Sequence, residues 1–350
     1  MPCERTVTAS GGAWPFVTLC AIDDDEGRFV WRAREHRKGL SRHHVTERTV
    51  PFWQQSGYNV LIGLIFAVGA ALFVTGSVMA LIPAESPLAV SDKVSNWVFF
   101  AGSIPFTTAA YLQHFQAANS GPTPDQVPDD MPARSSLRLI GWAPESPGWI
   151  STLTQFVGTI CFNFNTFDAI AAPRAWYLQD IEIWLPGMMG SVLFLVSAWL
   201  AFIETAHAHW AWRPSDLDWQ IAAVNLLGCV AFMLASTLAY VPAEALPGFV
   251  LAISFGALGF GALCFFVGAL LLVREARVDQ AQARSPSREP QGDGARGDQA
   301  CGDEPAATKP LTEEEERYPH REQDRGFAQC GHQSNRSGHH GPQDEPVREQ

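Results

Sequence analysis

The chain has 350 residues, of which 47% are hydrophobic and 17% are charged, whereas roughly 25% of an ordinary soluble domain is charged. The formal net charge is −12, but its acidic excess lies largely toward the C-terminus and no basic patch with interleaved aromatic residues occurs, which argues against a nucleic-acid partner. Seven cysteines without regular spacing exclude a disulfide framework and favour reduced thiols.

The N-terminal segment, residues 1–52, contains the apolar stretch PFVTLCAI, then DDDEG, then RFVWRA. No basic residues introduce the apolar stretch and acids follow it directly, so it is not a signal peptide. Two short apolar stretches around a polar turn predict a β-hairpin. The basic stretch that follows, REHRKGLSRHH, is expected to lie against anionic lipid head groups.

Six apolar windows follow, each close to the roughly 20 residues that a membrane-spanning helix needs. None contains Lys or Arg, and their two acids, Asp168 and Glu182, lie close to helix ends. In hydrocarbon the backbone must satisfy its own hydrogen bonds, so the windows predict helices. The fold class is therefore an all-α integral membrane protein with six transmembrane helices, at Tyr58–Ile82, Trp97–Ala117, Trp149–Ala171, Ile181–Ile203, Trp219–Val241 and Phe249–Val273.

The basic residues that flank these windows predict their orientation. Twelve Lys and Arg residues lie on the side that includes both chain ends, whereas the opposite side has only Lys93 and Arg174. Because Lys and Arg are concentrated in cytoplasmic loops, both termini are expected in the cytoplasm. The protein is thus predicted to be a multi-pass protein of the cell membrane.

An internal repeat runs through the windows. Each has a Gly followed four residues later by a Phe, which places both on one face of a helix. Such small residues let helix backbones approach closely in membranes. The predicted packing residues are Gly69, Phe73, Gly102, Phe106, Gly158, Phe162, Gly190, Phe194, Gly228, Phe232, Gly261 and Phe265.

The spacing of these glycines predicts three helical hairpins. Within consecutive pairs of windows the glycines are 33, 32 and 33 residues apart. This regularity indicates three copies of one unit. The hairpins cover residues 53–118, 142–209 and 210–276, with a cytoplasmic linker at 119–141 and a disordered cytoplasmic tail at 277–350, which is too polar to form a core.

The repeated pattern resembles a known family. The stretches GAALFVTGSVMAL with NWVFFAGSIPF, and GCVAFMLASTLAYV with GALGFGALCFF, are similar to the YrhK-like domain, a small two-helix membrane module. GTICFNFNTF with MMGSVLFLVSAWL resembles a more divergent copy. The resemblance implies three tandem modules over about residues 53 to 276 and brings no activity with it.

Polar residues accompany the packing faces. Gln155 and Asn165 share a face with Gly158, and Asn225 lies on the corresponding face of the fifth window. One interpretation is interhelical hydrogen bonding. The other is a polar cavity, in which Asn165 and Asp168 are candidate substrate-binding residues and Gln155 and Asn225 lie deeper.

A second polar cluster ends the fourth window. Glu204, His207 and His209 are candidate metal ligands, because Glu-x-x-His contributes to di-iron sites in helical bundles. Such a site needs a second motif of this kind, and the chain has only one. The alternative is a set of polar residues at the membrane interface.

The sequence does not predict an enzyme. It has no phosphate-binding loop, no His-Glu-x-x-His and no nucleophile elbow, so no catalytic residue and no cofactor is expected. The leading hypothesis is a scaffold or accessory membrane component in contact with lipid, with cytoplasmic tails for protein partners. The alternative is a transporter of a small solute or ion at Asn165 and Asp168. The oligomeric state stays open.

Overall fold

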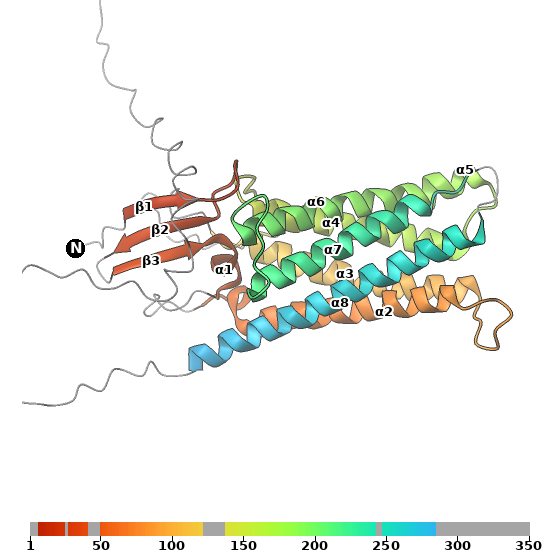
Figure 1. Cartoon of the computed structure of the whole chain (residues 1–350), viewed down its shortest axis with the longest axis horizontal. Helices are drawn as coiled ribbons and strands as arrows, with labels where there is room; N and C mark the ends of the chain where they lie inside the picture. The colour runs from red at the N-terminus through yellow and green to blue at the C-terminus, as the bar shows by residue number, and fades with distance from the viewer. Residues whose placement is uncertain (1–5, 25–26, 41–49, 122–136, 243–246, 285–350) are drawn as a thin grey trace, which may run out of the picture. The chain divides into compact units, whose positions relative to one another are not determined.

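Six long helices dominate the structure (Figure 1). The computed structural model describes residues 6–24, 27–40, 50–121, 137–242 and 247–284. Each long helix occupies one of the predicted windows. They are α2 (Ser56–Leu81), α3 (Asp92–Ala118), α4 (Pro147–Asp168), α6 (Leu185–Ala206), α7 (Leu217–Leu238) and α8 (Gly248–Arg284).

Four of the described helical segments are long and apolar enough to cross a membrane. They are α2, the continuous segment Trp176–Ala206, α7 and residues Gly248–Ala281 of α8. The helices α3 and α4 are of similar length but more polar, with Asn, Gln, His and Thr side chains along them. The chain thus has the helical, apolar character of a membrane protein.

The N-terminal segment forms a small sheet rather than a lone hairpin. Strands β1 (Thr6–Gly11), β2 (Leu19–Asp24) and β3 (Gly27–Arg32) pair antiparallel in the order β1-β2-β3. The pairing of β2 with β3 confirms the predicted hairpin. A third strand was not predicted, and it adds the partner that a hairpin needs for stability in water.

Several short elements were not predicted, and the helix α8 is longer than predicted. Helix α1 (Ala33–Lys38) follows β3 directly, and α5 (Trp176–Gln179) with η4 (Asp180–Trp184), one turn of π-helix, leads into α6. The helix α8 runs to Arg284, past the predicted end at Val273 and into the segment 277–350 that was predicted to be disordered. Good helix formers continue there, and Ser56 Oγ donates to Asp279 Oδ2 at 3.0 Å.

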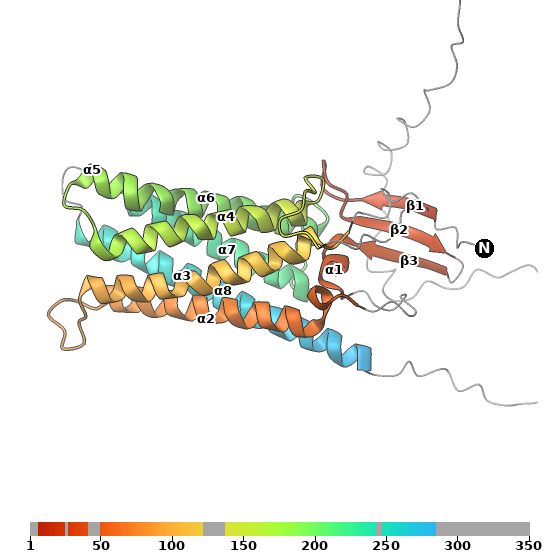
Figure 2. The same ribbon diagram turned by 180° about the vertical axis from the view of Figure 1, so that it is seen from behind.

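The long helices form a closed ring. Along the chain, α2 packs on α3, α3 on α4, α4 on α6, α6 on α7 and α7 on α8, and α8 returns to pack on α2. Both views show these helices side by side (Figures 1 and 2). Every long helix therefore has two neighbours, one face toward the ring axis and one face outward.

The predicted Gly and Phe residues meet across helix pairs. A Cβ atom at Gly69 would lie 2.9 Å from the Phe106 ring and 3.0 Å from the Gly102 carbonyl oxygen. A Cβ at Gly102 would lie 2.9 Å from the Phe73 ring in return. The same reciprocal contacts join Gly158 and Phe162 to Gly190 and Phe194, and Gly228 and Phe232 to Gly261 and Phe265.

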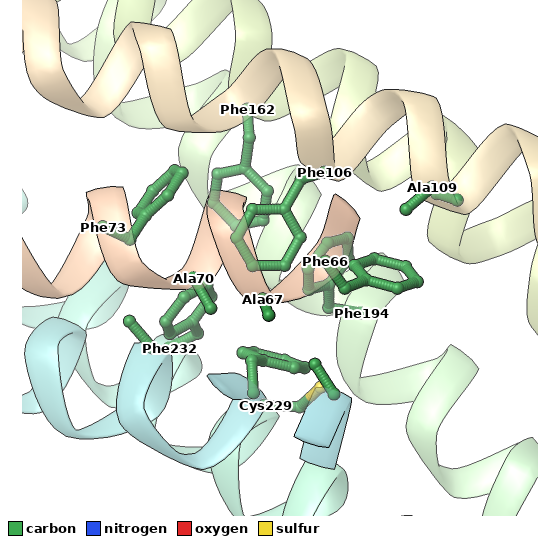
Figure 3. Packing of buried hydrophobic residues seen from close by; sticks show 14 of the residues in the cluster. Phe66, Ala67, Ala70, Phe73, Phe106, Ala109, Phe162, Phe194, Cys229 and Phe232 are labelled. Atoms are coloured by element: carbon green, nitrogen blue, oxygen red, sulfur yellow. The ribbon is translucent and has the colours of Figure 1, made fainter. Parts of the chain in front are cut away.

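The six phenylalanines converge at the ring axis. Phe73 packs against Phe106 with ring centroids 5.4 Å apart, and Phe162 against Phe194 at 5.1 Å. Phe232 lies 6.3 Å from Phe73 and 5.9 Å from Phe162, so it links the pairs. Figure 3 shows these rings in one cluster. The centre of the bundle is thus filled by aromatic side chains.

We expect Gly261→Ala to lower the free energy of unfolding by about 1–3 kcal/mol, because overpacking forces neighbours to move. Its Cβ would run into the Phe232 ring and lie 2.9 Å from the Gly228 carbonyl oxygen. Gly256→Ala in the same helix is the matched control, since a Cβ there has nothing within 4 Å. Unfolding of the purified protein in detergent measures both, and equal losses would contradict the close-packing role.

Candidate functional site

A cavity of about 100 Å³ lies inside the ring at the end that α1 covers. Side chains from α1 and from all six long helices line it. Arg37 and Lys38 contribute from α1, whereas Phe194 and Phe265 of the central aromatic cluster contribute apolar wall. The cavity is therefore bounded both by charged groups and by the aromatic cluster.

Helix α1 directs three cationic side chains toward the bundle. Arg34, Arg37 and Lys38 stand at positions i, i+3 and i+4, which share one helix face, and all three are buried. Arg34 Nη1 lies 2.5 Å from Glu275 Oε1 and 2.6 Å from Asp218 Oδ1. Lys38 Nζ also pairs with Glu275.

These pairs correct the prediction that this basic stretch lies on lipid head groups. The part that the structure describes, residues 34–40, places its Arg and Lys side chains against acids of α7 and α8 and against Glu204 of α6. Paired carboxylates inside the protein are a fixed, desolvated partner for these cations, which a fluid lipid surface is not. The residues 41–44 of the stretch lie outside the described part.

The ion pairs change the acid–base behaviour of α1. Burial lowers the pKa of Arg34, but Asp218 and Glu275 raise it by more, so its pKa lies above its ordinary value. Burial and the charge of Arg34 lower the pKa of Lys38 to about 8, against the opposing effect of Glu275. Arg34 is therefore the permanent cation of this cluster.

The third pair lies beside a backbone contact. Arg37 Nη2 is 2.6 Å from Glu204 Oε2, and the Glu204 side chain is 1% exposed. The guanidinium Nε of Arg37 and the second carboxylate oxygen of Glu204, Oε1, have no hydrogen-bond partner among the described residues. A Cβ at Gly148 would collide with Glu204 Oε1, so α4 approaches the pair as closely as a glycine permits.

The candidate metal ligands do not assemble. Glu204 is engaged by Arg37, and His207 Nδ1 is 2.9 Å from Thr18 Oγ1. Within the described ranges no group of three His, Cys, Asp or Glu side chains is arranged to hold a metal ion. The Glu204 carboxylate instead forms an ion pair with α1. The spacing of Glu204 and His207 does not predict this pair.

The candidate substrate-binding residues divide into two sets. Gln155 and Asn225 both line the cavity. Asn165 and Asp168 do not line it, and Asn165 Nδ2 donates to the Ile183 carbonyl oxygen at 2.8 Å. That carbonyl belongs to the π-helical turn before α6, where backbone hydrogen bonds span five residues instead of four. Asn165 therefore has a structural role at the π-helical turn that leads into α6.

Sequence reasoning missed the residues of α1 as part of the site. The available signal was the position of the acids, because Glu204, Asp218 and Glu275 all lie at helix ends on the predicted cytoplasmic side, where the basic stretch also lies. Comparison of the chain with protein families, with characterised proteins and with solved structures gives no match.

We expect Glu204→Gln to destabilise the protein by about 3–5 kcal/mol, because it leaves the buried Arg37 charge without its partner. The double variant Arg37→Gln, Glu204→Gln should recover most of this loss, since it removes both charges. Glu182→Gln is the control, because Glu182 is exposed. Denaturant titration measures the free energies of unfolding. Equal stability of Glu204→Gln and Glu182→Gln would contradict the pairing.

A pH dependence follows from His207. Burial, then Arg213 and Arg32, lower its pKa from 6.5 to about 4, so the folded protein holds the imidazole neutral. Below pH 6.5 the unfolded chain gains a proton that the folded protein does not, and stability falls as the pH falls toward 4. The loss reaches about 3 kcal/mol.

We expect His207→Asn to flatten this dependence. Asn suits the left-handed backbone at this position and does not titrate. Melting temperatures of both proteins between pH 7 and pH 4.5 measure the effect, and the wild type should lose more. Parallel curves would show that His207 does not contribute.

Proposed function

We propose that the chain is a multi-pass membrane protein whose six long helices all cross the bilayer as three repeated hairpins, with both termini in the cytoplasm. We further propose that it acts as a non-enzymatic scaffold or accessory membrane component. The hairpins pair α2 with α3, α4 with α6 and α7 with α8. As three such modules, the chain resembles tandem YrhK-like domains.

The polar seam between α3 and α4 supports six spans. Asn163 Nδ2 donates to Thr107 Oγ1 at 2.9 Å, and Thr166 Oγ1 donates to Ser103 Oγ at 3.3 Å. These side chains lower the mean hydropathy of the two helices, yet they form hydrogen bonds with one another between the helices. Polar groups paired in this way are compatible with a membrane interior.

The outward faces of all six helices support the same proposal. Each long helix carries large apolar side chains that remain exposed on the protein, as lipid contact requires. One example from each helix, in chain order, is Val68, Ile104, Phe164, Val192, Val230 and Leu263.

Repeated local structure supports three hairpins in addition to the Gly–Phe contacts. Trp142 packs on Trp149 with ring centroids 5.6 Å apart, and Trp212 packs on Trp219 at 5.0 Å. In both cases the second indole donates to a backbone carbonyl of the preceding loop, at 3.0 and 2.8 Å. The second and third hairpins thus begin with the same aromatic pair.

The aromatic cluster is the observation that supports a role other than transport. Five of its phenylalanines, together with Ser103 and Thr159, leave a void of only about 10 Å³ at the ring axis, which is at the lower limit for one water molecule. A bundle filled in this way is suited to a fixed membrane component that holds its tails for protein partners.

Transport of a small solute or ion is the second candidate, and the cavity favours it. The polar groups available to such a solute are Gln155 and Asn225, rather than Asn165 and Asp168. Passage through the ring axis would require the phenylalanines between the cavity and the other end to separate.

Labelling of single cysteines in a cysteine-free background tests the number of spans. With six spans the loop that contains Glu145 is cytoplasmic, whereas with only the four apolar segments as spans it is external. We therefore expect Glu145→Cys to resist a membrane-impermeant maleimide in intact cells and to react after lysis. Glu85→Cys should react in intact cells and Ser215→Cys should not, under either count. Reaction of Glu145→Cys in intact cells would overturn the six-span proposal.

A further inference from the structure

The cavity contains side-chain amides without protein partners. Gln113, Gln155 and Asn225 line it, and their side chains make no hydrogen bond with any residue that the structure describes. These side chains are half-buried, and amides that face a cavity without protein partners bind water or a ligand there. Each amide offers both a donor and an acceptor, and the hydroxyls of Ser151 and Ser197 lie in the same wall.

The charges around the cavity balance. The three cations of α1 are matched by Glu204, Asp218 and Glu275, and each cation has at least one of these carboxylates as a direct partner. An ionic ligand would have to break such a pair and leave a buried charge uncompensated, at a large cost. A ligand without net charge leaves every pair intact.

The size of the cavity limits the ligand. A water molecule needs roughly 10–15 Å³ of such space, so a cavity of about 100 Å³ holds several waters or one solute of a few non-hydrogen atoms. Drug-sized ligands occupy larger clefts, of about 300–1,000 Å³.

We propose that the cavity beneath α1 binds a small uncharged polar solute, of the polyol or urea type, through the side-chain amides of Gln155 and Asn225. This inference goes beyond the scaffold role, because a fixed membrane component needs no ligand. It also does not require transport, since the solute enters and leaves on the same side of the aromatic cluster.

Equilibrium dialysis of the purified full-length protein tests the proposal. The probes are radiolabelled glycerol and urea as neutral solutes, and acetate and methylammonium as charged ones. We expect saturable binding of at least one neutral probe, near one molecule per chain, and no saturable binding of the charged probes. Absence of saturable neutral binding would mean that only water fills the cavity and would overturn the proposal. Saturable binding of acetate or methylammonium would also overturn it.

Amide variants locate the site. Asn225→Leu should weaken binding about tenfold or more, because the ligand loses its hydrogen bonds. Asn165→Leu is the matched control, since this amide lies outside the cavity, and it should bind like the wild type. Asn225 also contacts Gly268, so Gln155→Met provides a second cavity variant if Asn225→Leu does not fold. Unchanged binding in the folded cavity variants would overturn the assignment.

Discussion

The contact between a glycine on one helix and a phenylalanine on its neighbour is the constraint on which the rest of the bundle depends. Lipid supplies no hydrophobic drive between helices, so close van der Waals packing must hold them together. Each glycine admits the partner backbone, as Gly69 illustrates, where a Cβ atom would lie only 3.0 Å from the Gly102 carbonyl oxygen. Each phenylalanine is thereby directed to the ring axis, where the rings fill the centre and leave the cavity on the α1 side.

The α1 helix adds a second, electrostatic layer of organisation. Its three cations meet acids from three different helices, α6, α7 and α8. A buried ion pair contributes little net stability compared with apolar packing, but loss of one partner is costly. The ion pairs therefore favour one docked position of α1, because a rotated α1 or a displaced α7 would leave charges unpaired. The hydrogen bond from Asn59 Nδ2 to the Lys38 carbonyl oxygen, at 2.9 Å, fixes α1 on α2 as well.

Local and periodic features were predictable, whereas long-range pairing was not. The Gly–Phe spacing identified all twelve residues of the central contacts, because residues four apart share one face of a helix. The β2–β3 hairpin was also found from local composition. The ion pair of Arg37 could not be predicted, since its partner Glu204 is 167 residues away and no periodicity links the two residues. For the same reason, sequence alone did not distinguish Asn225, which lines the cavity, from Asn165, which supports a π-helical turn.

The order of synthesis gives these ion pairs a consequence for biogenesis. Arg34 is made early, yet its partner Glu275 lies 241 residues later, in the last helix. The pairs of Arg34 and Lys38 with Glu275 therefore cannot form until α8 has been made. Truncation before α8 would leave Arg34 and Lys38 without Glu275 and the aromatic cluster without Phe265. The full set of α1 ion pairs thus forms only when α8 is in place.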